Sequence, residues 1–480
     1  MNKLGRGLEV ALVCFALAGC ADQKRDIALY QRQLDALPGA TRPLPPDYTP
    51  LTLLDALRLA EKNDESLGLS GETYLQALIA RDKAFSAFLP TIALDLNYSQ
   101  VQKLRGSDGT PAHSFNIPIN GDNALFSLNP YQSEAIIEQD TGAARQQREL
   151  LLNEQQIVLL DVVQAYYAVL TNERQVKVFQ NSLAEQDERV RQAELEFQIG
   201  SGTPLNIAQS QSLASSTRVS LVNAEASVKT SRAMLQFLVG VPVEDRPLSD
   251  GYEPPADVGQ SLSAWLDEAD LHRQDLLAAT EAVEAARQGV RAAVGEYFPS
   301  ISFDPSYLIY TETPPIQQKW MFGLSVNIPI FSAGQTEADV RNALSILRAA
   351  VLSQSQARKQ VQEDIETGWA NLENSRRQVV ELRVELKATV DALVLARRQF
   401  NVGLATNLDV LTAEDTLLST QLQLATQIYQ EKINYLNLLR VAGNLTIDSA
   451  ITQPGATTEP ANELEITPPS AYRSTTLPAR

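Results

Sequence analysis

Two stretches of this chain, about 200 residues apart, repeat the same order of sequence signals. Residues 88–94 (FLPTIAL) return as 297–303 (YFPSISF), residues 197–200 (FQIG) return as 400–403 (FNVG), and residues 238–240 (LVG) return as 441–443 (VAG). This spacing predicts an internal duplication of one unit: a short helix, a pair of strands that begins at a proline, a very long helix, a glycine turn and a second long helix. We therefore expect two interlocked halves of one body.

The helices predicted for this unit are exceptionally long. No proline occurs from Ser332 to Thr452, and apolar residues recur every three or four positions through this stretch. The pattern predicts a helix from about Gln335 to Val402, which would reach roughly 100 Å at 1.5 Å per residue. The first half repeats the pattern at about 135–199 and 204–239. Helices of this length must bury their apolar stripes against each other in a coiled-coil-like array.

Short alternating stretches predict four strands, at roughly 91–101, 122–131, 300–310 and 319–331. In residues 320–330 every even position is apolar, whereas the odd positions are mostly small or polar. A strand of a soluble sandwich would explain any one of them. However, each is about ten residues long, the length that crosses a bilayer when tilted. Four strands cannot close a membrane barrel, so the membrane interpretation requires several copies of the chain.

The chain begins with residues typical of a bacterial lipoprotein signal peptide, predicted at 1–19. A short apolar run ends in the sequence LAGC at 17–20, which makes Cys20 the predicted lipid anchor. The alternative is an ordinary signal peptide followed by a chance cysteine. Ala21 instead of aspartate after Cys20 resembles outer-membrane lipoproteins. The proline-rich residues 20–50 are expected to form an extended, lipid-anchored segment.

These signals divide the rest of the chain into four parts. The first repeat is predicted at 51–242 and the second at 262–445, and each contains a helix, two strands and a long helical hairpin. A linker rich in proline and glycine joins them at 243–261. Residues 446–480 are rich in Thr, Pro and Glu, lack an apolar period and are expected to form a flexible tail.

Composition and motifs argue against several classes of function. The chain has 40 Lys and Arg against 58 Asp and Glu, a formal net charge of −18, so nucleic acid is not an expected partner. His113 and His272 are the only histidines, and neither has the neighbours of a zinc site. The chain shows neither a phosphate-binding loop after a strand nor a nucleophile elbow. We therefore predict no catalysis, no cofactor and no metal.

One turn and the helix after it carry the most specific resemblance. Residues 402–406 (VGLAT) and 408–411 (LDVL), with the opening LTLLDAL at 51–57 and the strand starts at 88–90 and 297–299, resemble the TolC-like outer-membrane efflux protein family over about residues 50–445. The resemblance implies an α+β membrane protein. It would be a homotrimer with a 12-stranded transmembrane β-barrel, four strands from each chain, continued by a long α-helical barrel in the periplasm of a Gram-negative bacterium.

The same resemblance implies a function. The trimer would be the passive outer-membrane exit duct of a tripartite efflux system for drugs or other toxic small molecules. Its partners would be a periplasmic adaptor protein and an inner-membrane pump, which the lipoprotein signal suggests is of the resistance-nodulation-division type. Two alternatives stay open: a duct for a type I protein secretion system, and a lipid-anchored coiled-coil scaffold that transports nothing.

The residues of the two glycine turns are the first candidate site. Gly200 and Gly403 are predicted to end helices in the left-handed conformation, Thr203 to cap the next helix, and Thr406 and Asp409 to form a capping box. Two helical hairpins alone would explain these residues. The resemblance implies that the turns also dock the adaptor, which makes this tip consist of Gly200, Ser201, Gly202, Thr203, Val402, Gly403, Leu404, Ala405 and Thr406.

The second candidate site is the periplasmic entrance or gate, assigned by the resemblance to Asp409, Thr412 and Asn206. Three symmetry-related copies of Asp409 would concentrate negative potential in a narrow channel. As a cap, Asp409 would instead only satisfy a backbone donor, and the two roles are compatible. Thr412 stands where family members often have an acidic residue, and Asn206 where aspartate occurs. An ion-pair lock like that of some members is therefore not expected here.

Overall fold

The structure is a computed structural model, and it describes residues 23–35, 50–92, 97–101, 112–119, 126–243, 246–255, 261–311 and 320–447. The predicted signal peptide, the lipid anchor Cys20 and most of the predicted tail lie outside the described residues. The side chain of His113 also lies outside what the structure describes. The predictions made for them remain predictions.

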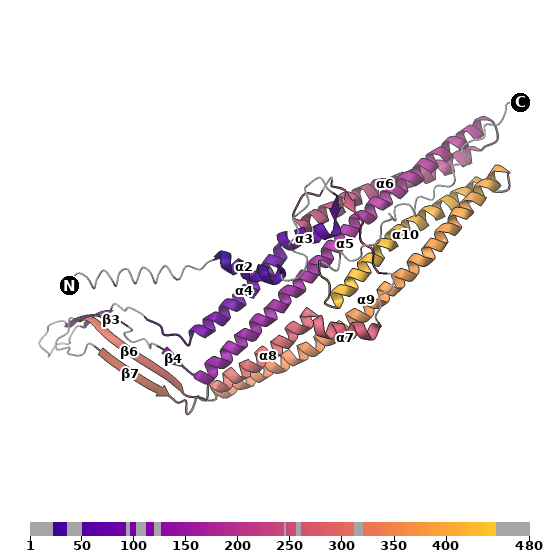
Figure 1. Ribbon diagram of the computed structural model, residues 1–480. Helices are drawn as coiled ribbons and strands as arrows, with labels where there is room; N and C mark the ends of the chain where they lie inside the picture. The colour runs from indigo at the N-terminus through magenta and orange to yellow at the C-terminus, as the bar shows by residue number, and fades with distance from the viewer. Residues whose placement is uncertain are drawn as a thin grey trace. The chain divides into compact units, whose positions relative to one another are not determined.

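Eight of the described helices form two series of matching length (Figure 1). The first series is α3 (Leu53–Asn63), α4 (Glu65–Ser86), α5 (Pro130–Gln198) and α6 (Pro204–Val239), with 11, 22, 69 and 36 residues. The second is α7 (Leu262–His272), α8 (Gln274–Gly295), α9 (Gln335–Asn401) and α10 (Asn407–Val441), with 11, 22, 67 and 35 residues. These paired lengths are what an internal duplication predicts. Among the described residues, no helix is long and apolar enough to cross a membrane.

The two series are interlocked. The chain divides into two compact units that cut across the repeats. The first unit combines the residues up to Gln33 with Leu69–Leu152 and Gln274–Lys359. The second combines Leu34–Gly68, Asn153–Arg273 and Gln360–Arg480. Each unit therefore takes segments from both halves of the sequence.

The first unit contains an antiparallel sheet. Its strands are β2 (Asn97–Val101), β3 (Ala112–Ile119), β4 (Phe126–Leu128), β6 (Ser300–Thr311) and β7 (Trp320–Asn327). β2 pairs with β3, and β6 pairs with β7 from Ser300 to Tyr307. Along the edge of β6 that faces away from β7, β3 pairs with one end of β6 and β4 pairs with the other. β3 and β4 run in the same direction, since both are antiparallel to β6. They therefore occupy one position in the sheet, which gives four positions per chain.

The sequence predicted β6 and β7 better than the strands of the first half. Of the stretch predicted at 91–101, only β2 is described as a strand, and residues 93–96 lie outside the described residues. The strand predicted at 122–131 was wrong in extent. Among the described residues of this stretch, only Phe126–Leu128 form a strand, because Pro130 begins α5, and proline suits the first turn of a helix. β3 was missed because Pro118 lies inside it and a proline argues against a strand, although Phe115, Ile117 and Ile119 follow a strand period.

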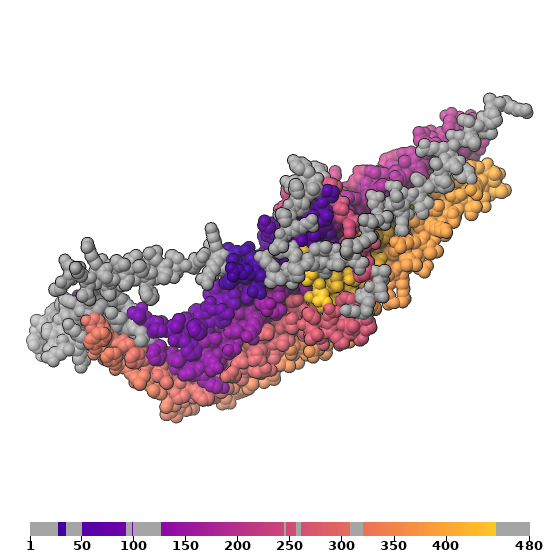
Figure 2. Space-filling model, viewed as in Figure 1, coloured from indigo at the N-terminus to yellow at the C-terminus, as the bar shows by residue number. Residues whose placement is uncertain are grey.

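The β6–β7 hairpin has one apolar and one polar face, as the alternation predicted. The pairs Ile301–Val326, Phe303–Leu324, Pro305–Phe322 and Tyr307–Trp320 lie on one face, and the pairs Ser302–Ser325 and Asp304–Gly323 lie on the other. The apolar face is not buried within the chain: Phe322 is 68% exposed and Leu324 is 72% exposed. The hairpin forms the salmon-coloured surface at the lower left of Figure 2.

The second unit has a core that fixes the segment between the repeats. β1 (Leu51–Thr52) and β5 (Leu248–Ser249) form a short parallel pair, and the hydroxyl of the buried Tyr166 lies 2.8 and 2.7 Å from the carbonyl oxygens of Leu51 and Ser249. Next to them, Lys432 Nζ donates to both carboxylate oxygens of Asp250 at 2.8 and 2.9 Å. Residues 246–255 of the predicted linker are thus an ordered part of this unit.

Two predictions about the ends of the repeats need correction. Ile447, the second residue of the tail predicted at 446–480, is buried, so the packed part of the second unit extends at least to Ile447. Residues 20–50 were expected to be extended, but Gln23–Asp35 forms the helix α2. The error has a simple cause. The prolines of this segment begin at Pro38, and nothing before that position prevents a helix.

Candidate functional site

The two glycine turns join α5 to α6 and α9 to α10, and they share one backbone geometry. Gly200 and Gly403 both adopt left-handed conformations, with φ of 81° and 77°. The amide of Gly200 donates to the carbonyl of Phe197 at 3.0 Å, and the amide of Ser201 donates to that of Glu196 at 2.8 Å. This pair of hydrogen bonds is a Schellman motif, which closes the end of a helix.

The second turn repeats this motif. The amide of Gly403 donates to the carbonyl of Phe400 at 2.9 Å, and the amide of Leu404 donates to that of Gln399 at 2.8 Å. A Cβ at Gly200 or Gly403 would meet nothing within 4 Å, so the backbone conformation, not crowding, selects glycine there. At Gly202 the reason is space, because a Cβ would come within 2.8 Å of the Phe197 nitrogen. The predicted left-handed caps are confirmed.

The helices that leave the turns are capped as predicted. The hydroxyl of Thr203 accepts a hydrogen bond from the Asn206 amide at 3.2 Å, and Pro204 follows as the first helical residue. Thr406 and Asp409 form a complete capping box. Asp409 Oδ2 accepts from the amide and from the hydroxyl of Thr406, both at 2.7 Å. These two hydrogen bonds lower the pKa of Asp409, and the bond from the backbone amide has the larger effect. The side chain of Asp409 is exposed.

Apolar side chains project from both turns into solvent. Ile199 is 78% exposed and Leu404 is 81% exposed, and Val402, Leu205 and Leu408 are exposed as well. Ile199 corresponds to Val402 and Leu205 to Leu408 in the two repeats. The turns therefore present two similar apolar surfaces on rigid backbones. Such surfaces are typical of sites that bind other proteins.

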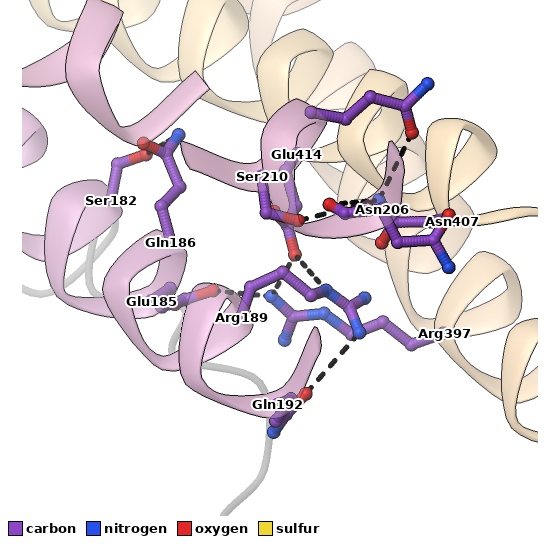
Figure 3. Close-up of polar contacts among 11 residues, drawn as sticks. Ser182, Glu185, Gln186, Arg189, Gln192, Asn206, Ser210, Arg397, Asn407 and Glu414 are labelled. Carbon is purple, nitrogen blue, oxygen red and sulfur yellow. Dashed lines mark hydrogen bonds and ion pairs between the residues drawn. The ribbon is translucent and has the colours of Figure 1, made fainter. Parts of the chain in front are cut away.

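The two hairpins contact each other just beyond the turns. Asn407 is buried, and its Nδ2 donates to the backbone oxygen of Asn206 at 3.4 Å and lies 3.5 Å from Ser210 Oγ (Figure 3). Asn206 thus joins the hairpins through its backbone oxygen. Asp409, in the other repeat, directs its carboxylate onto Thr406, the cap of its own helix. Thr412 donates its hydroxyl to the carbonyl of Leu408 at 2.8 Å and makes no contact with Asn206 that the structure describes.

A group of charged residues from three helices lies about two turns further along the hairpins (Figure 3). Arg397 of α9 donates through Nη2 to Glu185 of α5 at 2.7 Å and to Glu414 of α10 at 3.0 Å. Arg189 of α5 approaches the same oxygen of Glu414, with Nε at 3.8 Å, and its guanidinium lies 5.3 Å from the ring centre of Phe400. We call Glu185, Arg189, Arg397 and Glu414 the hairpin ion cluster.

The hairpin ion cluster is balanced in charge but unevenly buried. The side chains of Arg189 and Glu414 are only 9% and 5% exposed. Burial lowers the pKa of Arg189, and the charge of Glu414 opposes this. Burial also acts to lower the pKa of Arg397, but its bonds to Glu185 and Glu414 outweigh burial and raise it. Within the described residues, Arg189 Nη2 and Glu414 Oε2 have no hydrogen-bond partner.

The sequence did not identify this cluster. Its four members come from three helices, and only the fold brings them together. One signal was present: Glu414 follows Val410 and Leu411 and precedes Leu418 at helical spacing, so it is a charged residue within a buried apolar stripe. The prediction that no ion-pair lock would form considered only Thr412 and Asn206. Ion pairs do join the hairpins, at other positions.

Nothing in the described part of the chain resembles a metal site. It contains no group of three or more His, Cys, Asp or Glu residues placed to hold a metal ion. His272 lies at the exposed end of α7, where Nδ1 donates to the carbonyl of Glu268 at 3.1 Å. The site thus consists of exposed apolar side chains and a group of charged side chains at the ends of two hairpins.

Comparison with known proteins identifies the arrangement. The family model described as outer membrane efflux protein matches residues 73–241 and 265–444, which span both repeats. The chain belongs to this family. The resemblance inferred from residues 402–411 is therefore confirmed, together with the outer membrane as the location and efflux as the role.

Individual relatives agree with this assignment. The chain is 28% identical over 407 residues to the outer membrane efflux protein BepC of Brucella suis, covering 83% of this chain and 86% of BepC. It is 24% identical over 296 residues to the probable outer membrane lipoprotein SilC of Salmonella typhimurium, covering 60% of this chain and 63% of SilC. A crystal structure of CusC matches with a TM-score of 0.74 at 19% identity, over 85% of this chain and 99% of CusC. This last match shows a common fold.

Proposed function

We propose that this outer membrane efflux protein is the passive exit duct of a tripartite system that exports small toxic molecules. Family membership carries the proposal. An inner-membrane pump, which we propose is of the resistance-nodulation-division type, supplies the energy, and a periplasmic adaptor joins it to the duct. The chain itself serves as a conduit, which is the role of the family to which it belongs.

The duct is a homotrimer whose strands close a barrel in the outer membrane. Two features of the chain support this. Its sheet has four strand positions, and the outer edges of β2 and β7 pair with no other described strand. In lipid an open edge leaves backbone groups unpaired, so only a closed sheet is stable. Three chains contribute 3 × 4 = 12 strands, within the range of outer-membrane barrels. The apolar face of the β6–β7 hairpin then meets lipid.

The two glycine turns are the docking site for the adaptor. Their backbones are fixed by Schellman motifs, and the apolar side chains of Ile199, Val402 and Leu404 are exposed. A protein partner that covers them removes this apolar area from water. Cys20 carries the lipid that anchors the chain to the membrane, and the relative SilC bears the name of a lipoprotein.

Asp409, Thr412 and Asn206 lie at the entrance to the duct. Asp409 is exposed, and hydrogen bonds from the amide and hydroxyl of Thr406 lower its pKa. Three copies around one axis place three carboxylates at the mouth of the channel, where they favour cations and repel anions. The same carboxylate can serve as cap and as entrance charge. Only its Oδ2 accepts hydrogen bonds from Thr406, so the carboxylate keeps its charge and a second oxygen.

Export and conductance, measured together, test this function. The protein is purified in detergent, its mass is determined, and single channels are recorded after it enters a lipid bilayer. In parallel, accumulation of a fluorescent dye is compared between cells with and without the gene. We expect a trimer that conducts ions, and a higher dye content in the cells that lack it.

Two other results would each identify a different function. A loss of a secreted polypeptide, with unchanged dye content, would identify a protein secretion duct. A protein that conducts no ions and changes neither dye nor secreted polypeptide would be a scaffold. The proposal therefore fails in either case, and the pattern of results says why.

A further inference from the structure

One charged side chain lies on the polar face of the β6–β7 hairpin. In the five described strands of this sheet, Asp304 alone is an Asp, Glu, Lys or Arg. The neighbouring positions on the same face hold Ser302, Gly323 and Ser325. Ser302 Oγ donates to Asp304 Oδ2 at 3.4 Å, and among the described residues the carboxylate forms no ion pair. Asp304 is therefore a negative charge that no described cation balances.

The sheet leaves space beside this carboxylate. Asp304 pairs with Gly323 of β7, and a Cβ built on Gly323 would lie 3.3 Å from Asp304 Cβ and 3.5 Å from its Oδ2. Glycine inside a strand often marks a place where another group approaches closely. On the other edge of β6, β4 pairs up to Phe303 and β3 pairs from Tyr307 onward, so no described strand pairs with Asp304 there. The side chain of Asp304 is accordingly partly exposed.

The opposite face of the hairpin fixes the direction of Asp304 in the proposed trimer. Phe303 and Pro305, its neighbours on β6, lie on the apolar face, which meets lipid in that trimer. A carboxylate in lipid is costly, whereas the interior of an outer-membrane barrel is polar. Asp304 follows Ser300, the first residue of β6, by about 13 Å along the strand. In the proposed barrel it therefore lies within the span of the membrane, with its side chain in the lumen.

Three copies of the chain bring three such carboxylates to one level of a narrow lumen. Twelve strands spaced about 4.8 Å apart and tilted by about 40° give a barrel with a radius of about 12 Å. An aspartate side chain reaches inward by about 3 Å, two carbon–carbon bonds, so the carboxylates lie about 9 Å from the axis. The Debye length is about 8 Å at physiological ionic strength. The three charges therefore act on the ions that pass through the lumen.

We propose that Asp304 sets the charge preference of the duct within the membrane, where its three copies favour cations over anions. This rests on the trimeric duct proposed above and adds to it a determinant in the strands, apart from the entrance. Walls of low dielectric constant focus the field of the carboxylates into the lumen. Coulomb's law with screening gives a cation-to-anion ratio on the order of tenfold at about 0.01 M salt, and less than about 1.5-fold at about 1 M.

Reversal potentials of single trimers in a KCl gradient test this preference. Asp304→Asn keeps the shape of the side chain and removes its charge, whereas Ser302→Ala removes the hydrogen-bond partner and keeps the charge. Both changes are made in the Asp409→Asn chain, so that the charge proposed for the entrance is absent. Asp304→Asn should lower the cation-to-anion permeability ratio at least about threefold near 0.01 M and less than about 1.5-fold near 1 M. Ser302→Ala should leave the ratio unchanged at both concentrations.

A second measurement compares one trimer before and after a chemical change, so that differences in assembly have no influence on it. Asp304→Cys is treated in the bilayer with a water-soluble methanethiosulfonate that attaches a sulfonate group. Phe303→Cys, the neighbouring residue on the apolar face, is the matched control. The sulfonate should restore the cation preference in Asp304→Cys, and a reagent that attaches a trimethylammonium group should reverse it. Phe303→Cys should respond to neither reagent.

Each other outcome overturns the proposal. A ratio that Asp304→Asn leaves unchanged would make the carboxylate only a structural partner of Ser302. An equal fall at low and high salt would exclude a screened charge as the cause, and an equal fall in Ser302→Ala would point to the shape of the strand. Equal responses of Asp304→Cys and Phe303→Cys would place Asp304 outside the lumen. A chain that forms no conducting trimer would overturn the exit duct together with this proposal, whereas an unchanged ratio in conducting trimers overturns this proposal alone.

Discussion

Arg397 of α9 donates to Glu185 of α5 at 2.7 Å, although 212 residues separate them in the sequence. This bond joins the two hairpins behind their turns. Glu414, which accepts from Arg397 at 3.0 Å, extends the connection to α10 and toward Arg189. The two turns are therefore held together by charged side chains as well as by the contact between Asn407 and Asn206.

The first prediction concerns the unequal burial of the two acids in this cluster. Glu414→Gln leaves two guanidinium groups near one another, one of them buried, without the anion between them. Breaking a buried pair by removing one partner costs roughly 3–5 kcal/mol, whereas an exposed pair contributes about 1 kcal/mol or less. Glu185 is 40% exposed and Glu414 is 5% exposed. Glu414→Gln should therefore lower the melting temperature far more than Glu185→Gln.

Circular dichroism of the detergent-purified protein at 222 nm, a wavelength that reports helix, measures this difference. The helices of both variants are expected to form at low temperature, since glutamine is as compatible with a helix as glutamate. Equal melting temperatures for the two variants would mean that Arg189 and Arg397 find other partners when Glu414 loses its charge.

The second prediction concerns the docking turn. Gly403→Arg forces a residue with a Cβ into the left-handed conformation, at roughly 1–2 kcal/mol, and places a charge among the exposed apolar side chains. Gly403→Asn enters the same conformation at lower cost and adds no charge. Export of the dye should fail in the arginine variant while trimers still assemble, and it should persist in the asparagine variant.

The comparison separates docking from folding. Trimer content is measured by size-exclusion chromatography and adaptor binding by co-purification with a tagged adaptor. If both variants lost export equally while trimers remained, the backbone of the turn, not the charge, would decide function. If trimers disappeared in the arginine variant, the turn would be needed for assembly.

The sequence predicted most of what local patterns determine. The caps at Thr203 and Thr406 and the left-handed Gly200 and Gly403 follow from residue types at fixed offsets, and all four are present. The long helices follow from a proline-free apolar period. β3 was not found in this way, because Pro118 inside it argues against a strand, and its pairing with β6 is a contact across the fold.

The contacts across the fold were beyond the sequence for a different reason. The hairpin ion cluster depends on which faces of α5, α9 and α10 meet, and no local pattern fixes that. The same holds for the ring of Tyr30 in α2, which lies against Gly71 in α4, a contact between residues 41 positions apart in segments that appear unrelated. The tight spacing at Gly71 is visible only once α2 is placed.

The third prediction tests the two faces of the β6–β7 hairpin. Phe322→Lys places an ammonium group on the apolar face, which costs roughly 2–4 kcal/mol per chain at the middle of a bilayer. Ser325→Lys makes the same change on the opposite face, where Ser325 pairs with Ser302. Trimer yield from outer membranes should fall strongly for Phe322→Lys and little for Ser325→Lys, and only the latter should change conductance. Equal losses would indicate a sheet buried on both faces within protein.

The last prediction separates the two roles of Asp409. Its pKa is lowered by hydrogen bonds from the amide and hydroxyl of Thr406. A depressed folded-state pKa means that the stabilising contribution of the cap is fully present above the ordinary aspartate pKa and is lost as the pH falls through the lowered value. At neutral pH the carboxylate is therefore ionised in both roles, and a substitution, not a pH change near neutrality, is the informative experiment.

Two variants divide the roles of Asp409. Thr406→Ala weakens the cap but keeps the charge, and Asp409→Asn removes the charge but keeps an oxygen that can accept the amide of Thr406. If three Asp409 carboxylates line the entrance, Asp409→Asn reduces cation preference and block by multivalent cations in single-channel recordings, while Thr406→Ala leaves both unchanged. If Asp409 is only a cap, both variants lower the melting temperature, and neither moves the reversal potential. An unmoved reversal potential in Asp409→Asn would place the entrance elsewhere on the inner helices.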